Sequence, residues 1–282
     1  MSKVKIIVSS NSGFCFGVKR ALDIARAALK KKGKVYSLGP IIHNPQVVRG
    51  FSERGLKIIK NIKTAVAEDA AILVPSHGID PKVLKNEKVI CIDTTCPLVS
   101  RVQRIVKDLR RRGYLIVIVG DKKHPEVKAL AGLAGRNAIV LKDRKKAGSF
   151  KPGSKKIAVV SQTTASFSTF KEILSEIAKK DFTELISFNT VCRNTIDRQK
   201  DAERIAGKVE VMLVIGGRQS ANTSRLADTC RRVNRNTYHI ETGKDLEKKF
   251  YNGKKRIGIA TGASTPPSAI KEVVEKINEA TT

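Results

Sequence analysis

A repeat built around three cysteines constrains the fold of this 282-residue chain more than any other feature of its sequence. Cys15, Cys96 and Cys192 each begin a stretch in which apolar residues recur at helical spacing, and each stretch ends near a glycine. A short apolar run that is typical of a buried strand follows each stretch and ends in a second glycine. In all three copies this glycine lies 24 residues after the cysteine, at Gly39, Gly120 and Gly216. Such a fixed offset predicts three structurally equivalent units.

The second half of each unit repeats more loosely. We expect a second strand that leads to a polar tip, and these strands are predicted at residues 72–74, 157–161 and 257–261. A helix follows, and then a third strand that runs to the next cysteine, predicted at 89–92 and 185–188. The third copy has no such strand after its helix. We therefore predict that the strand at residues 5–8, which precedes Cys15, pairs into the third unit.

Strands that alternate with helices indicate parallel sheets covered by helices on both faces. We predict an α/β fold of three pseudo-threefold-related units with mostly parallel sheets, a trefoil around a central cluster. The units are expected at residues 10–96, 97–192 and 193–282, and residues 1–9 complete the third. Ligands bind outside the carboxyl ends of such strands. A threefold arrangement would bring the three sets of strand ends to one centre.

The cysteines are expected to bind a metal cofactor. The N-terminus begins directly with a strand pattern and carries no apolar stretch suited to a signal sequence, so we expect a cytoplasmic protein with reduced thiols. Helix N-termini favour the thiolate that metals bind. Three thiolates without an obvious fourth ligand suit a [4Fe-4S] cluster with one open iron, and a zinc site with water is the alternative. Cys91 and Cys230 are expected to be small buried apolar residues.

Polar side chains gather at the predicted strand tips. They comprise three of the four histidines together with hydroxyl and amide groups: His43, His77, His124, Thr163, Thr164, Ser220, Asn222 and Ser264. Converging donors without a large aromatic pocket suit phosphate oxygens. Glu126 lies two residues after His124 and is the candidate acid. The alternative for Glu126 is an exposed glutamate that opens a helix after Pro125.

The charge balance leaves a further function open. The chain has 55 Lys and Arg against 26 Asp and Glu, a formal charge of +29. Nucleic-acid binding around a structural cluster is therefore an alternative function. Against it, the basic residues cluster at predicted helix ends, no nucleic-acid motif is present, and aromatic residues are few. A solvated basic surface or an anionic substrate would also explain the charge.

Several segments, in order along nearly the whole chain, resemble the 4-hydroxy-3-methylbut-2-enyl diphosphate reductases, also called the IspH or LytB family. The matching segments are Gly13-Phe14-Cys15-Phe16-Gly17-Val18, Gly39-Pro40-Ile41-Ile42-His43-Asn44, Ser76-His77-Gly78, Thr95-Cys96-Pro97-Leu98-Val99, His124-Pro125-Glu126-Val127, Gln162-Thr163-Thr164, Arg198-Gln199, Ser220-Ala221-Asn222 with Arg225-Leu226, and Gly262-Ala263-Ser264.

The resemblance implies a [4Fe-4S] cluster on the three repeat cysteines and the last step of the non-mevalonate isoprenoid route. In that step the allylic hydroxyl is lost with two electrons and two protons, which yields isopentenyl and dimethylallyl diphosphate. It implies that Glu126 delivers the proton and that Thr163 lies near the substrate hydroxyl. It implies diphosphate contacts from His43, His77, His124, Ser220, Asn222 and Ser264, and electrons from a ferredoxin or flavodoxin. An enzyme of this fold that acts on a different diphosphate is a further possibility.

One departure from the family pattern generates a prediction. Many relatives carry a second serine where this chain has Ala221, so one hydroxyl contact to the substrate is absent here. A hydrogen bond to a charged group is worth roughly 1.5–3 kcal/mol. We expect Ala221→Ser to tighten binding of the diphosphate substrate, measured by calorimetry, without changing the chemistry. An unchanged dissociation constant would show that position 221 makes no such contact.

Overall fold

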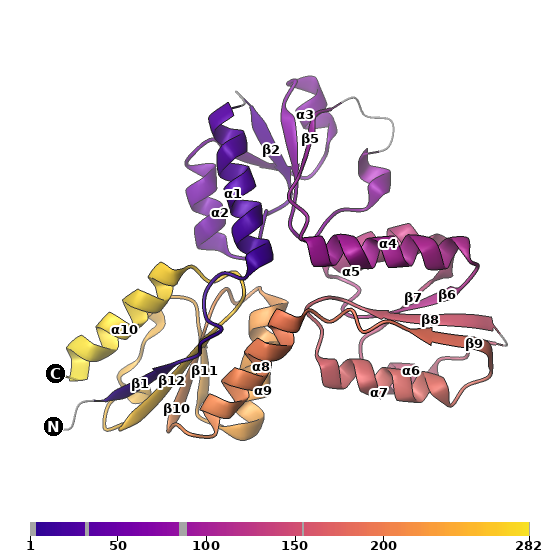
Figure 1. Ribbon diagram of the computed structural model, residues 1–282. Helices are drawn as coiled ribbons and strands as arrows, with labels where there is room; N and C mark the ends of the chain where they lie inside the picture. The colour runs from indigo at the N-terminus through magenta and orange to yellow at the C-terminus, as the bar shows by residue number, and fades with distance from the viewer. Residues whose placement is uncertain (1–3, 32–33, 85–88, 154, 282) are drawn as a thin grey trace. The chain divides into compact units, whose positions relative to one another are not determined.

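The computed structural model describes residues 4–31, 34–84, 89–153 and 155–281, and within them it contains three parallel sheets of four strands each. Figure 1 shows the three sheets with their helices. Sheet B holds the first repeat and has the order β3-β2-β4-β5. Its strands are β2 (Val35–Leu38), β3 (Leu56–Ile59), β4 (Ala71–Val74) and β5 (Cys91–Asp93). Its helical segments are α1 (Phe16–Lys31), α2 (Pro45–Ser52), α3 (Lys63–Ala67) and the 3-10 turn η1 (Pro81–Leu84).

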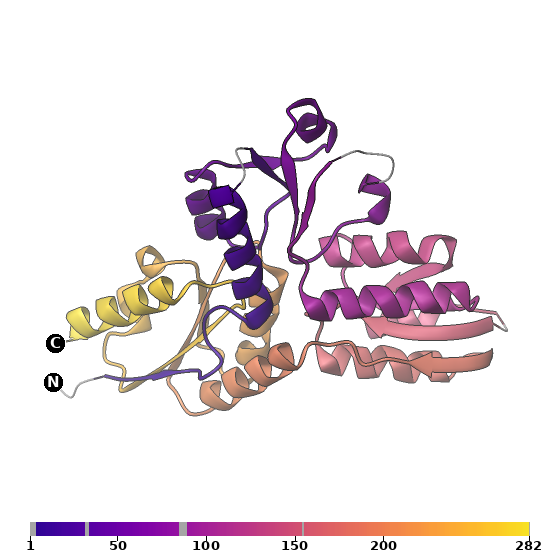
Figure 2. The same cartoon turned by 45° about the horizontal axis from the view of Figure 1, so that its top comes forward.

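Sheet C holds the second repeat, with the order β7-β6-β8-β9. Its strands are β6 (Leu115–Val119), β7 (Ala138–Leu141), β8 (Lys155–Ser161) and β9 (Phe182–Ser187). Its helical segments are α4 (Pro97–Arg111), α5 (Pro125–Ala134), η2 (Gly135–Asn137), α6 (Arg144–Ser149) and α7 (Phe167–Ala178). Helices α4 and α5 cover one face of the sheet, and α6 and α7 cover the other (Figures 1 and 2).

Sheet A holds the third repeat, with the order β1-β12-β10-β11. Its strands are β1 (Lys5–Val8), β10 (Val211–Ile215), β11 (Thr237–Ile240) and β12 (Arg256–Thr261). Its helical segments are α8 (Arg193–Ala206), α9 (Ala221–Val233), η3 (Gly243–Asp245), η4 (Lys248–Phe250) and α10 (Pro267–Thr281). Strand β1 pairs in parallel with β12, with Ile6 opposite Ile257, as predicted for the strand before Cys15.

The three sheets share one topology, because sheet A read in reverse is β11-β10-β12-β1. In each, the strand after the cysteine-led helix is flanked by the next two strands along the chain, and a fourth strand lies outside. The fourth strand of sheet A is the first strand of the chain. The prediction of three parallel-sheet α/β units is therefore confirmed.

One strand in each unit was not predicted from the sequence. The missed strands β3, β7 and β11 follow α2, α5 and α9 and lie at an edge of their sheets. Each has only four residues. They pair with β2, β6 and β10, respectively. Their amino-acid pattern is short and partly exposed, which makes it a weaker signal than the buried runs of β6 and β10.

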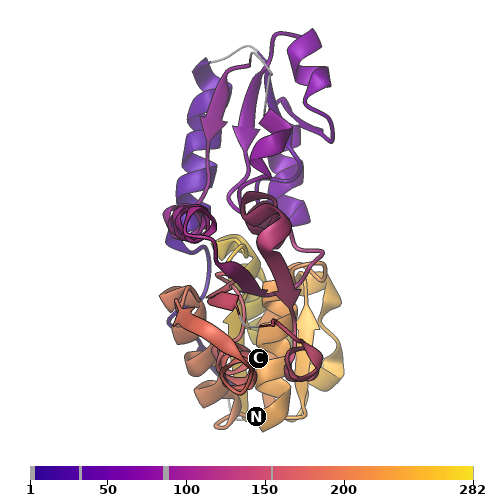
Figure 3. The ribbon, with the colours of Figure 1, turned by 90° about the vertical axis from the view of Figure 1, so that its right-hand side faces the viewer.

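Aliphatic side chains form the core on both faces of the sheets. In sheet C, Val102 and Val106 of α4 and Leu130 of α5 pack with Ile116 and Ile118 of β6. In sheet A, Val273 and Ile277 of α10 pack on one face, and the other face is covered by residues of α8 and α9. Figure 3 shows α1 alongside the strands of sheet B. None of the described helices combines the length and the apolar character needed to cross a membrane.

When the chain is divided into its most compact parts, it forms two units, whereas the repeat predicts three. One holds residues 1–19, 42–50 and 193–282 and contains sheet A. The other holds residues 20–41 and 51–192 and contains sheets B and C. Division of the chain at 10–96, 97–192 and 193–282 remains a proposal based on the repeat.

Strand β1 generates a stability prediction. The N–H groups of Lys5 and Ser9 donate to carbonyls of residues 255 and 259 at 2.9 and 2.8 Å, so the two-residue alternation places the Ile7 N–H on the Ile257 carbonyl. We expect Ile7→Pro to lower the free energy of unfolding by roughly 1–3 kcal/mol, because a buried carbonyl loses its donor. The free energy of unfolding is measured by urea denaturation, and Ile7→Val is the control. Equal midpoints for the two variants would contradict the pairing.

Candidate functional site

Each repeat cysteine lies at the start of a long helix, as the sequence predicts. Cys15 directly precedes α1, Cys96 is the N-cap of α4, and Cys192 directly precedes α8. All three are half-buried and none forms a disulfide. The Val18 N–H lies 3.5 Å from the Cys15 sulfur and donates to it.

One hydrogen bond fixes each of these cysteines and recurs in every unit. The backbone N–H of Cys96 donates to the carbonyl of Ser76 at 2.9 Å, immediately before His77. In the same way, Cys192 donates to the Thr163 carbonyl at 2.8 Å, and Cys15 donates to the Ala263 carbonyl at 3.1 Å, next to Ser264. The acceptors lie at the polar tips that follow β4, β8 and β12. The cysteine and the polar tip are therefore held together within each unit.

A second recurring bond fixes the other polar tip. The N–H groups of Gly39, Gly120 and Gly216 donate to the last residues of β3, β7 and β11 at 3.0, 3.0 and 2.9 Å. The helix that follows begins within six residues. His124 and Ser220 are the N-caps of α5 and α9. In the first unit one extra residue intervenes, and the side chain of Asn44 accepts from the Val47 N–H in the capping role instead of His43.

Within the unit that contains sheet A, the structure brings together His43 and Ser264, and Ser220 caps α9. The Ser264 hydroxyl donates to the His43 carbonyl at 3.1 Å, and the Ser220 hydroxyl accepts from the Thr223 N–H at 3.3 Å. Burial lowers the pKa of His43 below its usual value, so the ring is neutral at neutral pH and keeps one N–H donor. Asn222 lies in the first turn of α9 and is half-buried.

Close packing at this tip requires glycine. A Cβ added to Gly262 would lie 2.1 Å from the Thr223 hydroxyl oxygen, and one added to Gly216 would lie 2.8 Å from the same atom. Thr223 is completely buried, and its hydroxyl has no hydrogen-bond partner within the part of the chain that the structure describes. The hydroxyl is enclosed by the backbone at Gly216 and Gly262, so this tip is tightly packed.

Within the unit that contains sheets B and C, the structure brings together Glu126, Thr163 and two histidines. The carboxyl of Glu126 accepts from the Thr163 N–H at 2.7 Å through one oxygen and from the Thr163 hydroxyl at 2.8 Å through the other. The Glu126 N–H donates to Nδ1 of His124 at 3.2 Å. The rings of His77 and His124 lie edge to face, with centroids 6.5 Å apart.

Glu126 is 2% exposed, so the alternative of a surface glutamate is wrong. Its carboxyl is buried in the first turn of α5, where the positive end of the helix dipole stabilises negative charge. Thr163 binds both carboxyl oxygens and fixes the orientation of the group. This geometry suits a group that holds or transfers a proton at a defined place.

The two remaining cysteines differ from each other. Cys230 is buried on α9 as expected, and burial, with a smaller contribution from Glu203, raises the pKa of its thiol to about 12. Cys91 is exposed at the start of β5, so the prediction that it is buried is wrong. Strand β5 is an edge strand with an exposed–half-buried–exposed pattern, which the apolar neighbours of Cys91 in the sequence did not indicate.

The donor set of the three repeat cysteines fits a thiolate-bound metal cofactor. Soft thiolate ligands select iron–sulfur clusters or zinc, and an N–H donated to sulfur is a usual feature of cluster sites. Among the described residues, no group of three or more His, Cys, Asp or Glu side chains gathers as around a single metal ion. The fit therefore rests on the chemistry of the three thiols and on the N–H that Val18 donates to the Cys15 sulfur.

Arg198 is 3% exposed and has a structural role that was not predicted from the sequence. Its Nη1 donates to the carbonyl and the hydroxyl of Thr261 at 2.9 and 3.2 Å, and its Nη2 donates to the carbonyl of Gly13 at 3.0 Å. Arg198 thus joins α8 to the loop before Cys15 and to the end of β12. The available signal was its position on the same helical face as the buried Ala202 and Ile205.

Fold and strand ends together define an α/β protein of three equivalent parallel-sheet units, each with a cysteine at a helix start beside a polar tip. A family profile described as LytB protein matches residues 6–278. Similar curated proteins include those of Geobacter metallireducens (41% identical over 98% of both chains) and Caldanaerobacter subterraneus (41% identical over 97% of this chain and 96% of that one). Both are named 4-hydroxy-3-methylbut-2-enyl diphosphate reductase.

Two solved structures are also similar. One is described as (E)-4-hydroxy-3-methyl-but-2-enyl diphosphate reductase, the terminal enzyme of the non-mevalonate pathway. It is 39% identical and has a TM-score of 0.69 over 98% of this chain and 99% of that one. The other is the E-1-hydroxy-2-methyl-but-2-enyl-4-diphosphate reductase of Plasmodium falciparum, 25% identical, with a TM-score of 0.89 over 100% of this chain and 89% of that one. The chain belongs to the LytB family.

Arg198 generates a prediction. We expect Arg198→Met to lower the free energy of unfolding by at least about 3 kcal/mol, because each bond from a charged donor is worth roughly 1.5–3 kcal/mol. Amide exchange at residues 11–15 and 261–265 should accelerate. The control is Arg193→Met on the same helix, where the side chain is 84% exposed. If the two variants are equally stable, Arg198 does not fasten the loop before Cys15.

Proposed function

We propose that this chain is a 4-hydroxy-3-methylbut-2-enyl diphosphate reductase. The observation that carries the proposal is its match, over nearly the full length of both chains, to relatives with that name. The substrate R–OH takes up two electrons and two protons, the C–O bond breaks, and the products are R–H and water. R–H is a mixture of isopentenyl and dimethylallyl diphosphate. Nothing beyond the formal charge supports the alternative of a nucleic-acid-binding protein.

We propose that Cys15, Cys96 and Cys192 hold one [4Fe-4S] cluster with one open iron. Their equivalent places at three helix starts and their identical backbone hydrogen bonds support this assignment. Such a cluster supplies electrons and a Lewis-acidic iron for the substrate oxygen when it is bound. Zinc on the same three thiolates is the competing assignment, and it would supply no electrons.

The diphosphate contacts are proposed for His43, His77, His124, Ser220, Asn222 and Ser264. Their positions at strand ends and helix starts support this role, because helix N-termini and converging N–H and O–H donors bind phosphate oxygens. The neutral ring of His43 donates one N–H without bringing a charge.

Glu126 is the proposed proton donor, and Thr163 its partner near the substrate hydroxyl. The 2.8 Å contact between the Thr163 hydroxyl and the Glu126 carboxyl supports this pairing. When Glu126 is protonated, the direction of that bond reverses, and the threonine hydroxyl is then free to donate its own hydrogen. A proton can therefore pass from Glu126 through the Thr163 hydroxyl, while the Thr163 N–H keeps the carboxyl in place.

The electron donor is proposed to be a ferredoxin or flavodoxin, because each turnover needs two electrons and the proposed cluster must receive them from another molecule. A cytoplasmic location is proposed as well, since the three thiols must stay reduced to bind iron.

The identity of the cofactor is tested first. We expect protein purified without oxygen to be brown and to contain about four iron and four sulfide per chain. The triple variant Cys15→Ser/Cys96→Ser/Cys192→Ser should lose both, whereas Cys91→Ser should keep both. A colourless protein with one zinc and no sulfide after anaerobic reconstitution would contradict the proposal.

The role of Glu126 is tested by Glu126→Gln. We expect turnover to fall by at least about 100-fold, the usual contribution of a positioned proton donor, while iron and sulfide contents stay unchanged. The matched control is Glu172→Gln, which alters an exposed glutamate of α7 and should leave turnover unchanged. Full activity of Glu126→Gln would remove Glu126 as the proton donor.

A further inference from the structure

The outer surface of α4 is unusually basic. Between residues 101 and 112 there are six basic residues and one acidic residue. That acid, Asp108, already pairs with Arg111 and Arg112 at 3.2 and 3.7 Å. Arg101, Arg104, Lys107, Arg110 and Arg111 are exposed, and the opposite side of the helix is buried in the core of sheet C.

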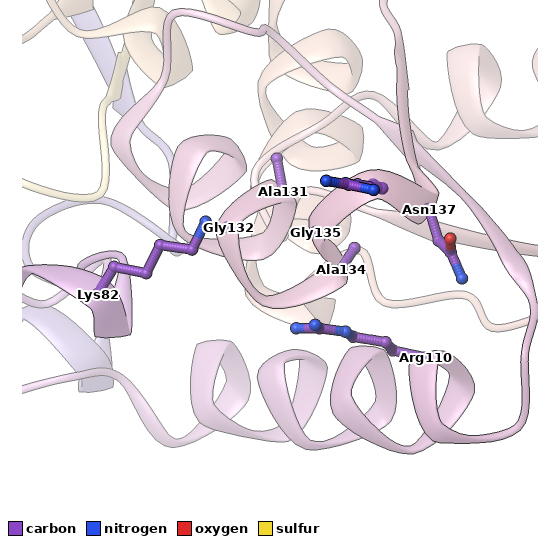
Figure 4. Close-up of a pocket in the computed structure, with 8 residues that line it drawn as sticks. Lys82, Arg110, Ala131, Gly132, Ala134, Gly135 and Asn137 are labelled. Carbon is purple, nitrogen blue, oxygen red and sulfur yellow. The ribbon is translucent and has the colours of Figure 1, made fainter. Parts of the chain in front are cut away.

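Two hollows adjoin this surface and share Arg110. One, of about 760 Å³, is lined by the following side chains: Arg104, Lys107, Asp108, Arg110, Arg111 and Leu133. The other, of about 570 Å³, lies at the end of α5 and contains Lys82, Arg136 and the small residues Ala131, Gly132 and Ala134. In Figure 4, Arg110 extends from α4 toward Gly135, and Lys82 approaches from the other side. Arg110 Nη1 donates to the Leu133 carbonyl at 2.9 Å, which fixes its position.

This surface leads directly to a proposed cluster ligand. Helix α4 begins at Cys96, and Leu98 in its first turn is 41% exposed. Arg104 lies eight residues after Cys96, about 12 Å along the helix axis, and the whole helix is about 22 Å long. Helix α4 therefore carries an exposed apolar residue, Leu98, close to the proposed redox site, and exposed basic residues further along the same helix.

We propose that the α4 surface (Leu98, Arg101, Arg104, Lys107, Arg110 and Arg111, with Lys82 and Arg136 beside it) is the docking site for an acidic one-electron carrier protein. The inference rests on the proposed function, which requires such a donor. Each docking event passes one electron from the reduced carrier to the cluster, and the oxidised carrier leaves. Two events supply the two electrons of one turnover.

The size of the surface fits this partner. Weak electron-transfer complexes bury less than about 1,200 Å² in total, or about 600 Å² on each protein, which is a disc about 28 Å across. Such a disc covers the length of α4, from Leu98 to Arg111. The cations are too widely spread for one small anion, and no aromatic side chain lines either hollow to stack on nucleic-acid bases.

The test compares two triple variants with the same change in charge. Arg104→Gln/Lys107→Gln/Arg111→Gln alters the docking surface, and the control Lys208→Gln/Lys248→Gln/Lys255→Gln alters exposed lysines of the sheet A unit. Anaerobic turnover is measured with reduced flavodoxin, an acidic carrier, and separately with reduced methyl viologen, a small cation. We expect kcat/KM for flavodoxin to fall roughly tenfold in the α4 variant at low ionic strength, and the difference to shrink as salt is added.

The control should change by less than twofold, and viologen-driven turnover should be the same in all three proteins. The proposal is overturned if kcat/KM for flavodoxin in the α4 variant lies within twofold of that of the control. It is also overturned if the α4 variant loses viologen-driven turnover to the same extent as flavodoxin-driven turnover. Binding of polyuridylate that is lost in the α4 variant while flavodoxin kinetics are unchanged would identify a nucleic-acid surface instead.

Failure of the proposed function gives a different result, because the unmodified chain would then show no turnover with viologen. In that case docking is tested by NMR. The unmodified chain, the α4 variant and the control are each added to ¹⁵N-labelled flavodoxin, and the widths of the flavodoxin signals are compared. Line broadening by the unmodified chain and the control, but not by the α4 variant, supports the docking surface, and equal broadening by all three overturns it.

Discussion

The hydrogen bond from each repeat cysteine to the polar tip of the neighbouring strand is the interaction on which the rest of the site depends. It appears three times, at 2.9, 2.8 and 3.1 Å, and joins Cys96 to Ser76, Cys192 to Thr163 and Cys15 to Ala263. A parallel sheet places strand ends and helix starts at the same edge, so this bond needs no special loop. It ties the proposed metal ligands to the proposed substrate contacts in every unit.

The sequence predicted these relations because a repeat multiplies a weak signal. One cysteine before a helix is uninformative, whereas three cysteines with a glycine at the same offset indicate a shared geometry. The pairing of β1 with β12 followed from the same comparison, since the third copy lacked a strand that the other two possess. The polar tips were found in this way too, and Glu126 lies buried beside Thr163.

What the sequence could not predict depends on exposure and on contacts between distant residues. Cys91 stands in an apolar run, but its strand is at the edge of sheet B and leaves it exposed. Arg198 has the sequence context of an ordinary helical arginine, yet its side chain binds Gly13 and Thr261, which lie 185 and 63 residues away. The hollows beside α4 depend on how Arg110 meets the end of α5, and local periodicity does not encode that contact.

The position of β1 has a consequence for the order in which the chain folds during synthesis. Residues 5–8 are synthesised before sheets B and C, but their partner β12 and the acceptor of the Cys15 bond, Ala263, are synthesised after both sheets. Sheets B and C contain only residues 35–187 and can form while the chain is still growing. A cofactor held by all three cysteines would therefore have a complete set of fixed ligands only after residues 256–263 have been synthesised. Loading of such a cofactor would follow the formation of sheets B and C and would depend on the pairing of β1 with β12.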